Sequence, residues 1–475
     1  MDLERLIAAL APEAVVQRAP VEVLDLAYDA RAAAPGTLFF CVPGTTRDGH
    51  EFAADAVSRG AVALVVERTL PPPVPQLVVA DARAAMAVAA DAFFGRPTDE
   101  LEVAGITGTS GKTTTAFLLH AILEAAGRRP GLVGTVETRV GGERRTLPRT
   151  TPEAIDLQRL FREMLDAGNR SAVIEASSHA SELRRLDGVR LRALAFTNLS
   201  HEHLDFHETM ERYFEAKRRL FLSSPRPRAA VGLGDAWGRR LAAELPGVVT
   251  FGLDADADVR PERLELGAWG ARLRAAGIEL RTHLRGRFNV ENVLAAVALA
   301  RLLEVGDEHV AAGVESVRGV PGRLEPVDEG QPFEGLVDYA HKPEALAHVL
   351  RAARELAEGR VLVVFGAGGD RDREKRPLMG RTAAELADVA FVTSDNPRSE
   401  DPQAIVDEIV AGAPRELRVE LDRGAAIAAA VEEARAGDVV VIAGKGHEPG
   451  QEIAGEIHPF DDRAVARAAL RGVPA

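Results

Sequence analysis

The sequence contains one cysteine, Cys41, among 475 residues. No intrachain disulfide can therefore form, and the cysteine usage gives no sign of an oxidising compartment. No apolar run approaches the ~20 residues that a membrane-spanning helix needs, so membrane insertion is not expected. The first residues, MDLERLIAALAPEAVVQ, lack the basic and then apolar pattern of a secretory signal. We therefore expect a soluble, cytoplasmic protein.

Basic residues are outnumbered: 58 Lys and Arg stand against 72 Asp and Glu, which gives a formal net charge of −14. A general attraction to nucleic acid or to an anionic membrane surface is not expected, so any anionic substrate must be held by a local concentration of positive charge. A short-period repeat is also missing, which argues against a solenoid or a propeller.

Apolar residues make up 46% of the chain and charged residues 27%, as in an ordinary globular protein. The length exceeds what one hydrophobic core usually serves. We predict three α/β domains: a small N-terminal domain (1–98), a central domain with a mainly parallel sheet and a phosphate loop (99–323), and a C-terminal doubly wound, Rossmann-like domain (324–475).

Buried strands are predicted from short apolar runs that alternate with helical stretches. They span 37–42, 61–66, 77–79, 101–107, 172–176, 191–197, 229–233 and 248–251, and then 335–339, 361–365, 389–393, 417–421 and 439–443. Residues 264–284 alternate polar and apolar residues like exposed antiparallel ribbons. In a doubly wound sheet the ligand lies at the carboxyl ends of the strands, so the loops after those ends matter most.

A glycine-rich loop follows the strand predicted at 101–107 and opens a helix predicted at 112–126. It reads Gly108-Thr109-Ser110-Gly111-Lys112-Thr113-Thr114. Backbone N–H groups and a helix N-terminus can surround phosphate oxygens, Lys112 adds positive charge, and the Thr113 hydroxyl suits Mg²⁺. Ile106 stands where the general pattern has its first glycine. The alternative is a glycine-rich turn that only starts a helix.

Closely spaced histidines follow another predicted strand, in the stretch His201-Glu202-His203-Leu204-Asp205-Phe206-His207. Metallo-hydrolases bind Zn²⁺ through an HxHxDH cluster, which would need histidine where Phe206 stands. For His201 and His207, ordinary surface or loop histidines are the simpler interpretation. Lys217 lies in an amphipathic helix, 210–221, where a lysine is usually a solvated charge.

The phosphate loop resembles the TGTxGKTT form found in Mur ligases and their folylpolyglutamate synthetase relatives. Further motifs resemble that family in its own order, over nearly the full chain. They are Thr150-Thr151-Pro152, Glu175-Ala176-Ser177-Ser178-His179, Thr197-Asn198-Leu199, His203-Leu204-Asp205, Tyr213-Phe214-Glu215-Ala216-Lys217, Phe288-Asn289-Val290-Glu291-Asn292, Pro321-Gly322-Arg323, Asp338-Tyr339-Ala340-His341 and Gly444-Lys445-Gly446-His447-Glu448.

The resemblance implies an ATP and metal site. It implies that Thr113, Glu175, His203 and Lys217 hold Mg²⁺, with Lys217 carrying a carbamate derived from CO₂, and that Lys112, Glu175, His203 and Lys217 are catalytic. It also implies that the phosphate loop, from Gly108 to Thr114, binds ATP together with Asn289, Asn292 and Arg323. Without the resemblance, Glu175 would be a strand-end carboxylate, and the asparagines would be helix caps or part of an exposed polar face.

The resemblance also implies a site for a UDP-linked sugar peptide. Its residues would be Ala30, Asp48, His50, Thr150, Thr151, Ser177 and Arg185. Ala30 stands where the family commonly has serine, and the stretch 181–184 departs from the usual pattern. Isolated Ser and Thr residues in loops are otherwise turn formers or caps.

The third domain is expected to select the amino acid, through Arg371, Asp395, Asn396, Arg398, Gly444 and Glu448. Asp395-Asn396-Pro397-Arg398 resembles the DNPR form of ligases that add meso-diaminopimelate. An arginine can grip a carboxylate with two hydrogen bonds, which suits an amino acid with a second carboxylate, and Glu448 suits its distal ammonium. Without the resemblance, the four residues form a good turn.

The implied reaction is ATP-dependent addition of meso-diaminopimelate to UDP-MurNAc-L-Ala-D-Glu through an acyl phosphate, in cytoplasmic peptidoglycan precursor synthesis. Two alternatives stay open at this point. A ligase acting on another acceptor, such as a folylpolyglutamate synthetase, would share the ATP site. A regulatory nucleotide-binding module would bind ATP without releasing phosphate.

Overall fold

The computed structural model describes residues 1–44, 47–254, 256–267 and 269–472. The chain forms two compact units, Met1–Val259 with Ala295–Gly313, and Arg260–Leu294 with Val314–Ala475. The domain boundaries at 98/99 and 323/324 remain predictions. Among the described residues, no helix is both long and apolar enough to cross a membrane.

The N-terminal part of the first unit is a five-stranded sheet in the order β1-β5-β4-β3-β2, parallel except for β1. Successive β3 side chains point to opposite faces, so Leu38 and Phe40 pack under α1 and α3, whereas Phe39 packs under α2. The elements are α1 (Leu3–Leu10), β1 (Ala14–Val16), β2 (Asp25–Ala27), β3 (Thr37–Phe40), α2 (Ala53–Ser58), β4 (Ala61–Val66), β5 (Gln76–Val78) and α3 (Ala82–Phe93).

The rest of the first unit is built on an eight-stranded sheet in the order β13-β12-β11-β6-β10-β7-β8-β9. It is parallel from β13 to β7, and β8 and β9 extend it as an antiparallel ribbon. The strands are β6 (Glu102–Thr107), β7 (Pro130–Val133), β8 (Thr138–Val140), β9 (Glu143–Arg145), β10 (Ser171–Glu175), β11 (Leu191–Phe196), β12 (Arg228–Gly232) and β13 (Val249–Phe251).

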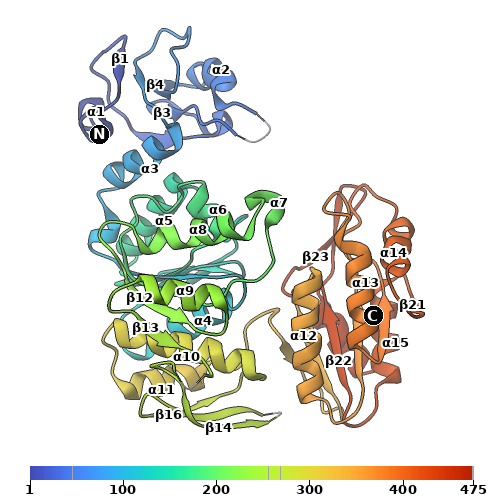
Figure 1. Ribbon diagram of the computed structural model, residues 1–475. Helices are drawn as coiled ribbons and strands as arrows, with labels where there is room; N and C mark the ends of the chain where they lie inside the picture. Colours follow the sequence, from blue (N-terminus) through green and yellow to red (C-terminus); the bar gives the residue numbers. More distant parts are fainter. Residues whose placement is uncertain (45–46, 255, 268, 473–475) are drawn as a thin grey trace. The chain divides into compact units, whose positions relative to one another are not determined.

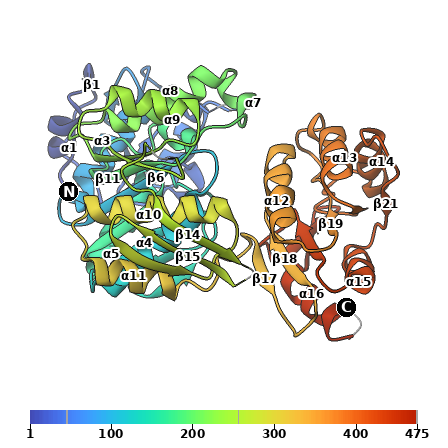
Figure 2. The ribbon, with the colours of Figure 1, turned by 60° about the horizontal axis from the view of Figure 1, so that its bottom comes forward.

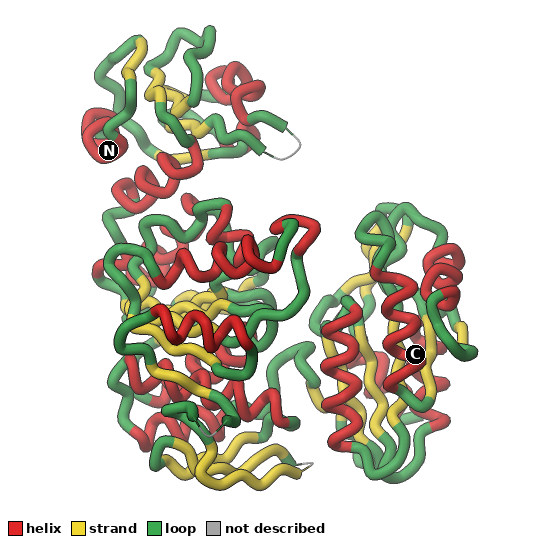
Figure 3. The backbone as a smooth tube through the Cα atoms, in the orientation of Figure 1, coloured by secondary structure: helices red, strands yellow, loops and turns green. Residues whose placement is uncertain are grey.

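Helices cover both faces of this sheet (Figure 1, Figure 3). The side chains of α5, α8 and α9 share one core with strands β10 and β11, while α4 packs against the opposite face. The helices are α4 (Lys112–Ala125), α5 (Ala154–Asp166), α6 (Ser178–Glu182), α7 (Leu204–His207), α8 (Met210–Phe221) and α9 (Ala236–Glu244). Because β6 pairs in parallel with both β10 and β11, the carboxyl ends of these three strands lie side by side.

The antiparallel ribbons predicted at 264–284 are confirmed as a three-stranded sheet of β14 (Pro261–Gly267), β15 (Gly270–Ala275) and β16 (Ile278–Thr282). Two helices follow this sheet, α10 (Arg287–Leu302) and α11 (Asp307–Ser316).

The C-terminal part of the second unit has a six-stranded sheet in the order β17-β18-β22-β19-β20-β21, parallel from β18 onward. Helices α12, α13 and α14 cover one face and α15 and α16 the other (Figure 2). The strands are β17 (Glu325–Val327), β18 (Glu334–Asp338), β19 (Val361–Phe365), β20 (Val389–Val392), β21 (Arg418–Val419) and β22 (Val439–Ala443). The helices are α12 (Pro343–Leu356), α13 (Lys375–Leu386), α14 (Pro402–Ala411), α15 (Arg423–Glu433) and α16 (Asp462–Leu470).

The doubly wound arrangement predicted for this part is confirmed, although the strand predicted at 417–421 is shorter, as β21. Strand β17 was not predicted, and neither was a hairpin of β23 (Gly450–Ile453) and β24 (Glu456–Pro459), which lies next to the loop that follows β20.

Candidate active site

The loop between β6 and α4 has the conformation that a phosphate loop requires. Gly108 has φ +146° and Gly111, at the N-cap of α4, has φ +86°. A side chain at Gly108 would collide with the Thr197 hydroxyl. The backbone can therefore turn sharply between strand and helix, and the α4 N-terminus is available to an anion.

Two residues after β11 hold this loop in place. The Thr197 hydroxyl donates to Ser110 O at 2.7 Å, and Ser110 N donates to Asn198 Oδ1 at 2.9 Å. Thr109 N donates to Asn198 O, also at 2.9 Å. The Thr-Asn-Leu motif, to which no role was assigned from the sequence, thus fixes the phosphate loop.

Two lysines meet at the same carbonyl oxygen of the loop. Lys112 Nζ donates to Gly108 O at 2.9 Å and to Thr109 O at 2.7 Å, and Lys217 Nζ donates to Gly108 O at 2.9 Å. Lys217 is only 1% exposed and lies 4.5 Å from the centre of the Tyr213 ring. The interpretation of Lys217 as a solvated surface charge is therefore wrong.

Burial lowers the pKa of the Lys217 ammonium well below its ordinary value, and the neighbouring charge of Lys112 lowers it further. Glu202 acts in the opposite direction, more weakly. A lysine in this setting loses its proton far more readily than one in water, which makes the neutral amine accessible.

Glu175, at the end of β10, is a buried carboxylate surrounded by hydroxyl and amide donors. Its Oε2 accepts from the Thr113 hydroxyl at 3.0 Å and from the Thr135 hydroxyl at 3.1 Å, and its Oε1 accepts from Thr135 N at 2.8 Å. The structure thus brings together the predicted residues Thr113 and Glu175, and it adds Thr135.

The histidine-rich stretch forms an aromatic cluster with His179 and Tyr213. The His203 ring lies 4.8 Å from the His179 ring and 5.9 Å from the Tyr213 ring, between centroids. The Tyr213 hydroxyl shares a hydrogen bond of 3.1 Å with Thr109 Oγ1, which links the cluster to the phosphate loop. His203 and Lys217 therefore both contact Tyr213.

His201 is exposed, as predicted, but the surface interpretation of His207 is wrong. His207 is buried, stacks on Tyr213 and shares a hydrogen bond of 3.0 Å with the Ser178 hydroxyl. Burial lowers the pKa of His207 to about 4, with help from His179 and Lys217. Among the residues with described positions, no group of three or more His, Cys, Asp and Glu side chains is arranged to hold a metal ion.

The predicted sugar-peptide residues of this part also lie together. The Thr151 hydroxyl donates to Glu175 O at 2.7 Å and to Ser177 Oγ at 3.1 Å, and Thr150 shares a hydrogen bond with Thr135. Arg185 Nη1 donates to Thr151 O at 3.1 Å. These residues adjoin Glu175, so a substrate held by them would reach the phosphate-loop edge of the sheet.

Sequence reasoning missed the charge cluster beside them. Arg185, Arg149 and Arg83 converge on the buried Glu153, at 2.9, 3.1 and 3.4 Å respectively. Three arginines around one carboxylate leave an excess of positive charge, which suits an anionic substrate. Arg149 and Glu153 flank the Thr-Thr-Pro motif, and that was the only sequence signal available.

In the N-terminal sheet region, Ala30 is buried at the start of a short 3₁₀ helix (Ala30–Ala32). His50 is fully engaged within the protein: its Nδ1 lies 2.6 Å from Asp48 Oδ1, and its Nε2 accepts from Glu67 N at 2.9 Å. Hydrogen bonds from His50 and Arg68 hold the pKa of Asp48 well below its usual range. Asp48 and His50 are therefore hydrogen-bond partners of each other within the protein.

The other residues predicted to bind ATP, Asn289, Asn292 and Arg323, lie in the second unit. Asn289 and Asn292 are buried in α10, where Asn292 Nδ2 donates to Asn289 Oδ1 at 3.0 Å and Asn289 Nδ2 donates to Arg285 O at 2.8 Å. The exposed polar face considered for them is therefore wrong. The Arg323 guanidinium lies over the Tyr339 ring, 5.2 Å from its centre.

The predicted amino-acid residues gather at the carboxyl edge of the C-terminal sheet. Asn396 connects the loop after β20 to the residues after β22. Its Nδ2 donates to Glu448 Oε2 at 3.0 Å, and its Oδ1 accepts from Lys445 Nζ at 3.1 Å. Lys445 is fully buried and also lies 3.8 Å from Asp395. Gly444 has a φ of +123°, which favours glycine, and a Cβ there would lie 3.1 Å from Asp395 Oδ2, so the carboxylate would have to shift slightly.

Arg398, in the same loop, donates from Nε to Glu452 Oε2 at 3.1 Å and from Nη1 to Gly369 O at 2.6 Å. Arg371 is exposed. Burial raises the pKa of the nearby Tyr339 to about 12, and the charges of Glu448 and Asp395 add to the shift. Lys445 and Glu452 are the members of this group that sequence reasoning did not single out.

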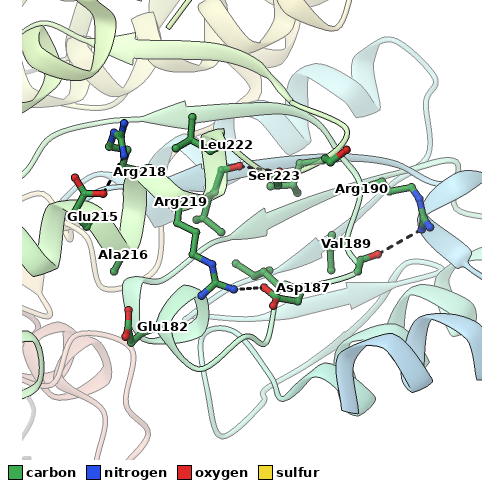
Figure 4. Close-up of a pocket in the computed structure, with 15 residues that line it drawn as sticks. Glu182, Asp187, Val189, Arg190, Glu215, Ala216, Arg218, Arg219, Leu222 and Ser223 are labelled. Atoms are coloured by element: carbon green, nitrogen blue, oxygen red, sulfur yellow. Dashed lines mark hydrogen bonds and ion pairs between the residues drawn. The ribbon is translucent and has the colours of Figure 1, made fainter. Parts of the chain in front are cut away.

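A pocket of about 750 Å³ lies elsewhere in the first unit, between residues 182–191 and the C-terminal half of α8 with the chain after it (Figure 4). Arg219 points to Asp187 across it, at 2.6 Å, and Arg218 pairs with Glu215 at 3.1 Å. The described residues that line this pocket include none of the predicted site residues.

Comparison with known proteins covers nearly the whole chain. Residues 24–94 match the Mur ligase family catalytic domain, 106–300 the Mur ligase middle domain, and 322–446 the glutamate ligase domain of Mur ligases.

Two relatives are named UDP-N-acetylmuramoyl-L-alanyl-D-glutamate–2,6-diaminopimelate ligase. The protein from Solibacter usitatus is 46% identical, over 98% of this chain and 96% of its own length. The protein from Geobacillus kaustophilus is 45% identical, over 95% of each chain. A solved structure of a ligase with the same name is 32% identical, with a TM-score of 0.68 over 95% of each chain. This chain belongs to the Mur ligase family.

Proposed function

We propose that this protein is the ATP-dependent ligase that joins meso-diaminopimelate to UDP-MurNAc-L-Ala-D-Glu. The names of its relatives support this, since they describe ligases of UDP-N-acetylmuramoyl-L-alanyl-D-glutamate and 2,6-diaminopimelate. The observation that carries the acceptor assignment is the loop after β20. It carries the guanidinium of Arg398, and its Asn396 donates to the carboxylate of Glu448, which follows β22, at 3.0 Å. An amino acid with a carboxylate and an ammonium at its far end has a partner for each.

ATP would bind with its phosphates at the phosphate loop. Lys112 and the N-terminus of α4 offer positive charge there, and we assign Gly108 to Thr114 to this contact. We propose that the rest of the nucleotide is bound by Asn289, Asn292 and Arg323.

The residues around Glu175 fit a Mg²⁺ ion. Mg²⁺ prefers hard oxygen ligands, and here a buried carboxylate stands beside the Thr113 and Thr135 hydroxyls, with His203 in the adjoining cluster. When bound, the ion would neutralise phosphate charge.

We also propose that Lys217 carries a carbamate. The neutral amine would attack CO₂, form an N–C bond and release a proton, so that a cation becomes an anion. The complete burial of Lys217 and the lowered pKa of its ammonium support this assignment, because only the neutral amine reacts.

The chemistry then proceeds in two displacements. A carboxylate oxygen of the D-glutamate residue attacks the γ-phosphorus, and ADP leaves, which gives an acyl phosphate. The amine of diaminopimelate attacks the acyl carbon, loses a proton, and expels inorganic phosphate. The protein contributes mainly positioning and charge stabilisation, with Lys112 facing the charge that develops on the phosphoryl oxygens.

Thr150, Thr151, Ser177 and Arg185 are proposed to hold the sugar peptide, since they adjoin Glu175. We propose that its uridine end is bound by Ala30, Asp48 and His50.

The three domains, 1–98, 99–323 and 324–475, are retained as a proposal. The nucleotide-linked substrate and ATP lead us to infer action in the cytoplasm.

The acceptor assignment is tested by measuring kcat/KM for meso-diaminopimelate and for L-lysine in wild type and Arg398→Ala. A charged hydrogen bond to a carboxylate contributes roughly 1.5–3 kcal/mol, so the value for diaminopimelate should fall by about one to two orders of magnitude. Lysine has no carboxylate at that position, and its value should change little.

Arg381→Ala, at an exposed arginine on α13, is the matched control and should leave both values unchanged. Equal losses for both acceptors in Arg398→Ala would mean that Arg398 only shapes the loop. A wild type that prefers lysine would overturn the acceptor assignment and leave the ligase assignment intact.

A further inference from the structure

The hairpin of β23 and β24 is attached directly to the loop that carries Arg398. Arg398 N donates to Glu452 O at 3.0 Å, and Ala454 N donates back to Arg398 O at 2.7 Å. Arg398 and Ile453 thus form a parallel β-bridge. The hairpin holds the Arg398 backbone, which has a positive φ of 51°.

The same hairpin also orients the Arg398 side chain. Glu452 Oε2 accepts from Nε at 3.1 Å, and Gly369 O accepts from Nη1 at 2.6 Å. Among the residues with described positions, Nη2 has no hydrogen-bond partner. Because a guanidinium is planar and rigid, two anchors at separate nitrogens fix its plane and leave Nη2 for a carboxylate.

Glu452 supports the neighbouring asparagine through its backbone. Glu452 N donates to Asn396 Oδ1 at 3.0 Å, on the oxygen that also accepts from Lys445. One residue of the hairpin therefore fixes both the Asn396 amide and the Arg398 guanidinium. The Glu452 carboxylate accepts from Nε, so it leaves Nη2 for a substrate carboxylate.

We infer that Glu452 is a positioning residue for acceptor recognition: it holds Arg398 in the orientation that binds the distal carboxylate of the amino acid. This inference rests on the proposed function. Glu452 itself need not contact the substrate. Its effect should therefore appear in the KM for the amino acid and depend entirely on Arg398.

The test is a double-mutant cycle with Glu452→Ala, Arg398→Ala and the double variant. The Glu452 side chain is 39% exposed, and a partly exposed ion pair is worth about two- to fivefold in affinity. We expect Glu452→Ala to raise the KM for diaminopimelate about two- to fivefold, with kcat, the KM for ATP and the values for lysine unchanged. In the Arg398→Ala background, it should cause no further change.

Two matched variants separate positioning from a structural role. Glu452→Gln retains a neutral acceptor for Nε and should lie between wild type and Glu452→Ala. Glu456→Gln alters an exposed glutamate of the same hairpin and should leave every value unchanged. A loss that persists in full without Arg398, or that affects lysine equally, would overturn the inference.

An unchanged KM in Glu452→Ala, in an enzyme that uses diaminopimelate, would also overturn it. A wild type that does not accept diaminopimelate is a different result: it would refute the proposed acceptor, which the wild-type measurement alone decides.

Discussion

At the scale of single residues, the chemistry of the phosphate loop centres on two lysines that donate to one carbonyl oxygen, Gly108 O. They have different surroundings. Lys112 is partly exposed at the start of α4, whereas Lys217 is buried under Tyr213. The same residue type can therefore serve as a permanent phosphate-binding cation at one position and as a reactive amine at the other.

Lys112→Ala should abolish most ligase activity without unfolding the protein. The side chain donates to two backbone oxygens of the loop, Gly108 O and Thr109 O, and a lost charge-stabilising donor at a reacting centre costs about 10²–10³-fold in kcat. The measurement is phosphate release, beside the denaturant midpoint. Turnover near the wild-type rate would contradict the assignment of the phosphate loop.

Lys217→Ala should also lose activity, but short carboxylic acids such as acetate should restore part of it. A small carboxylate can occupy the space of the missing side chain and replace the charge of the carbamate. Lys112→Ala is the control, because it should gain nothing from the acids. Lack of rescue at any acid concentration would count against the carbamate.

The burial of Lys217 has a sequence signal that a motif search overlooks. Tyr213, Phe214, Leu220 and Phe221 form the buried stripe of α8, and Lys217 follows Tyr213 by four residues and precedes Phe221 by four. Residues at this spacing share one helix face. A lysine inside an apolar stripe could thus have been predicted as buried. Among the partners of Glu175, Thr113 was predicted through the family resemblance, whereas Thr135, which comes from a distant segment, was not.

At the scale of elements, the parallel strands were the easiest to predict. Val361–Phe365 and Val439–Ala443 are continuous apolar runs because both faces of the sheet are covered by helices. The β23–β24 hairpin was missed because its turn, at Ala454 and Gly455, has positive φ angles of 52° and 84° without the Asn-Gly or Asp-Gly sequence typical of such turns.

The phosphate loop depends on glycine at residue 108 for two separate reasons. Gly108 has a positive φ, and its missing side chain leaves space for the Thr197 hydroxyl. Gly127, after α4, also has a positive φ (69°), but no atom lies within 4 Å of its Cβ position.

Gly127→Ala should therefore lower the free energy of unfolding only through the strain of alanine at a positive φ, by about 1–2 kcal/mol. Gly108→Ala should additionally displace the loop and weaken ATP binding, which calorimetric titration with ATP would measure. Equal ATP affinity in the two variants would contradict the role given to the contact between the loop and Thr197.

At the scale of the whole molecule, buried histidines make stability depend on pH. Burial lowers the pKa to about 4 for His120, His207, His341 and His447. Between the ordinary imidazole pKa, near 6.5, and about 4, the unfolded chain binds protons that the folded chain does not. The free energy of unfolding should therefore fall as pH falls through this window, by up to about 1.4 kcal/mol per pH unit for each proton.

Urea midpoints between pH 7.5 and 5.5 would measure this slope while most carboxylates stay ionised. His207→Gln should reduce the slope, because it removes one such group. A stability that rises as pH falls from 6.5 would show that these imidazoles are not held neutral by the fold.

The central claim is that this Mur ligase couples ATP cleavage to amide formation between UDP-MurNAc-L-Ala-D-Glu and meso-diaminopimelate. The most direct measurement is phosphate release with that nucleotide substrate, ATP and Mg²⁺, against a panel of single amino acids, with the product identified by mass. Phosphate release should require the nucleotide substrate and should be fastest with meso-diaminopimelate, which should appear in the product. ATP cleavage that is independent of both substrates, or a product that carries another amino acid at higher kcat/KM, would contradict the account.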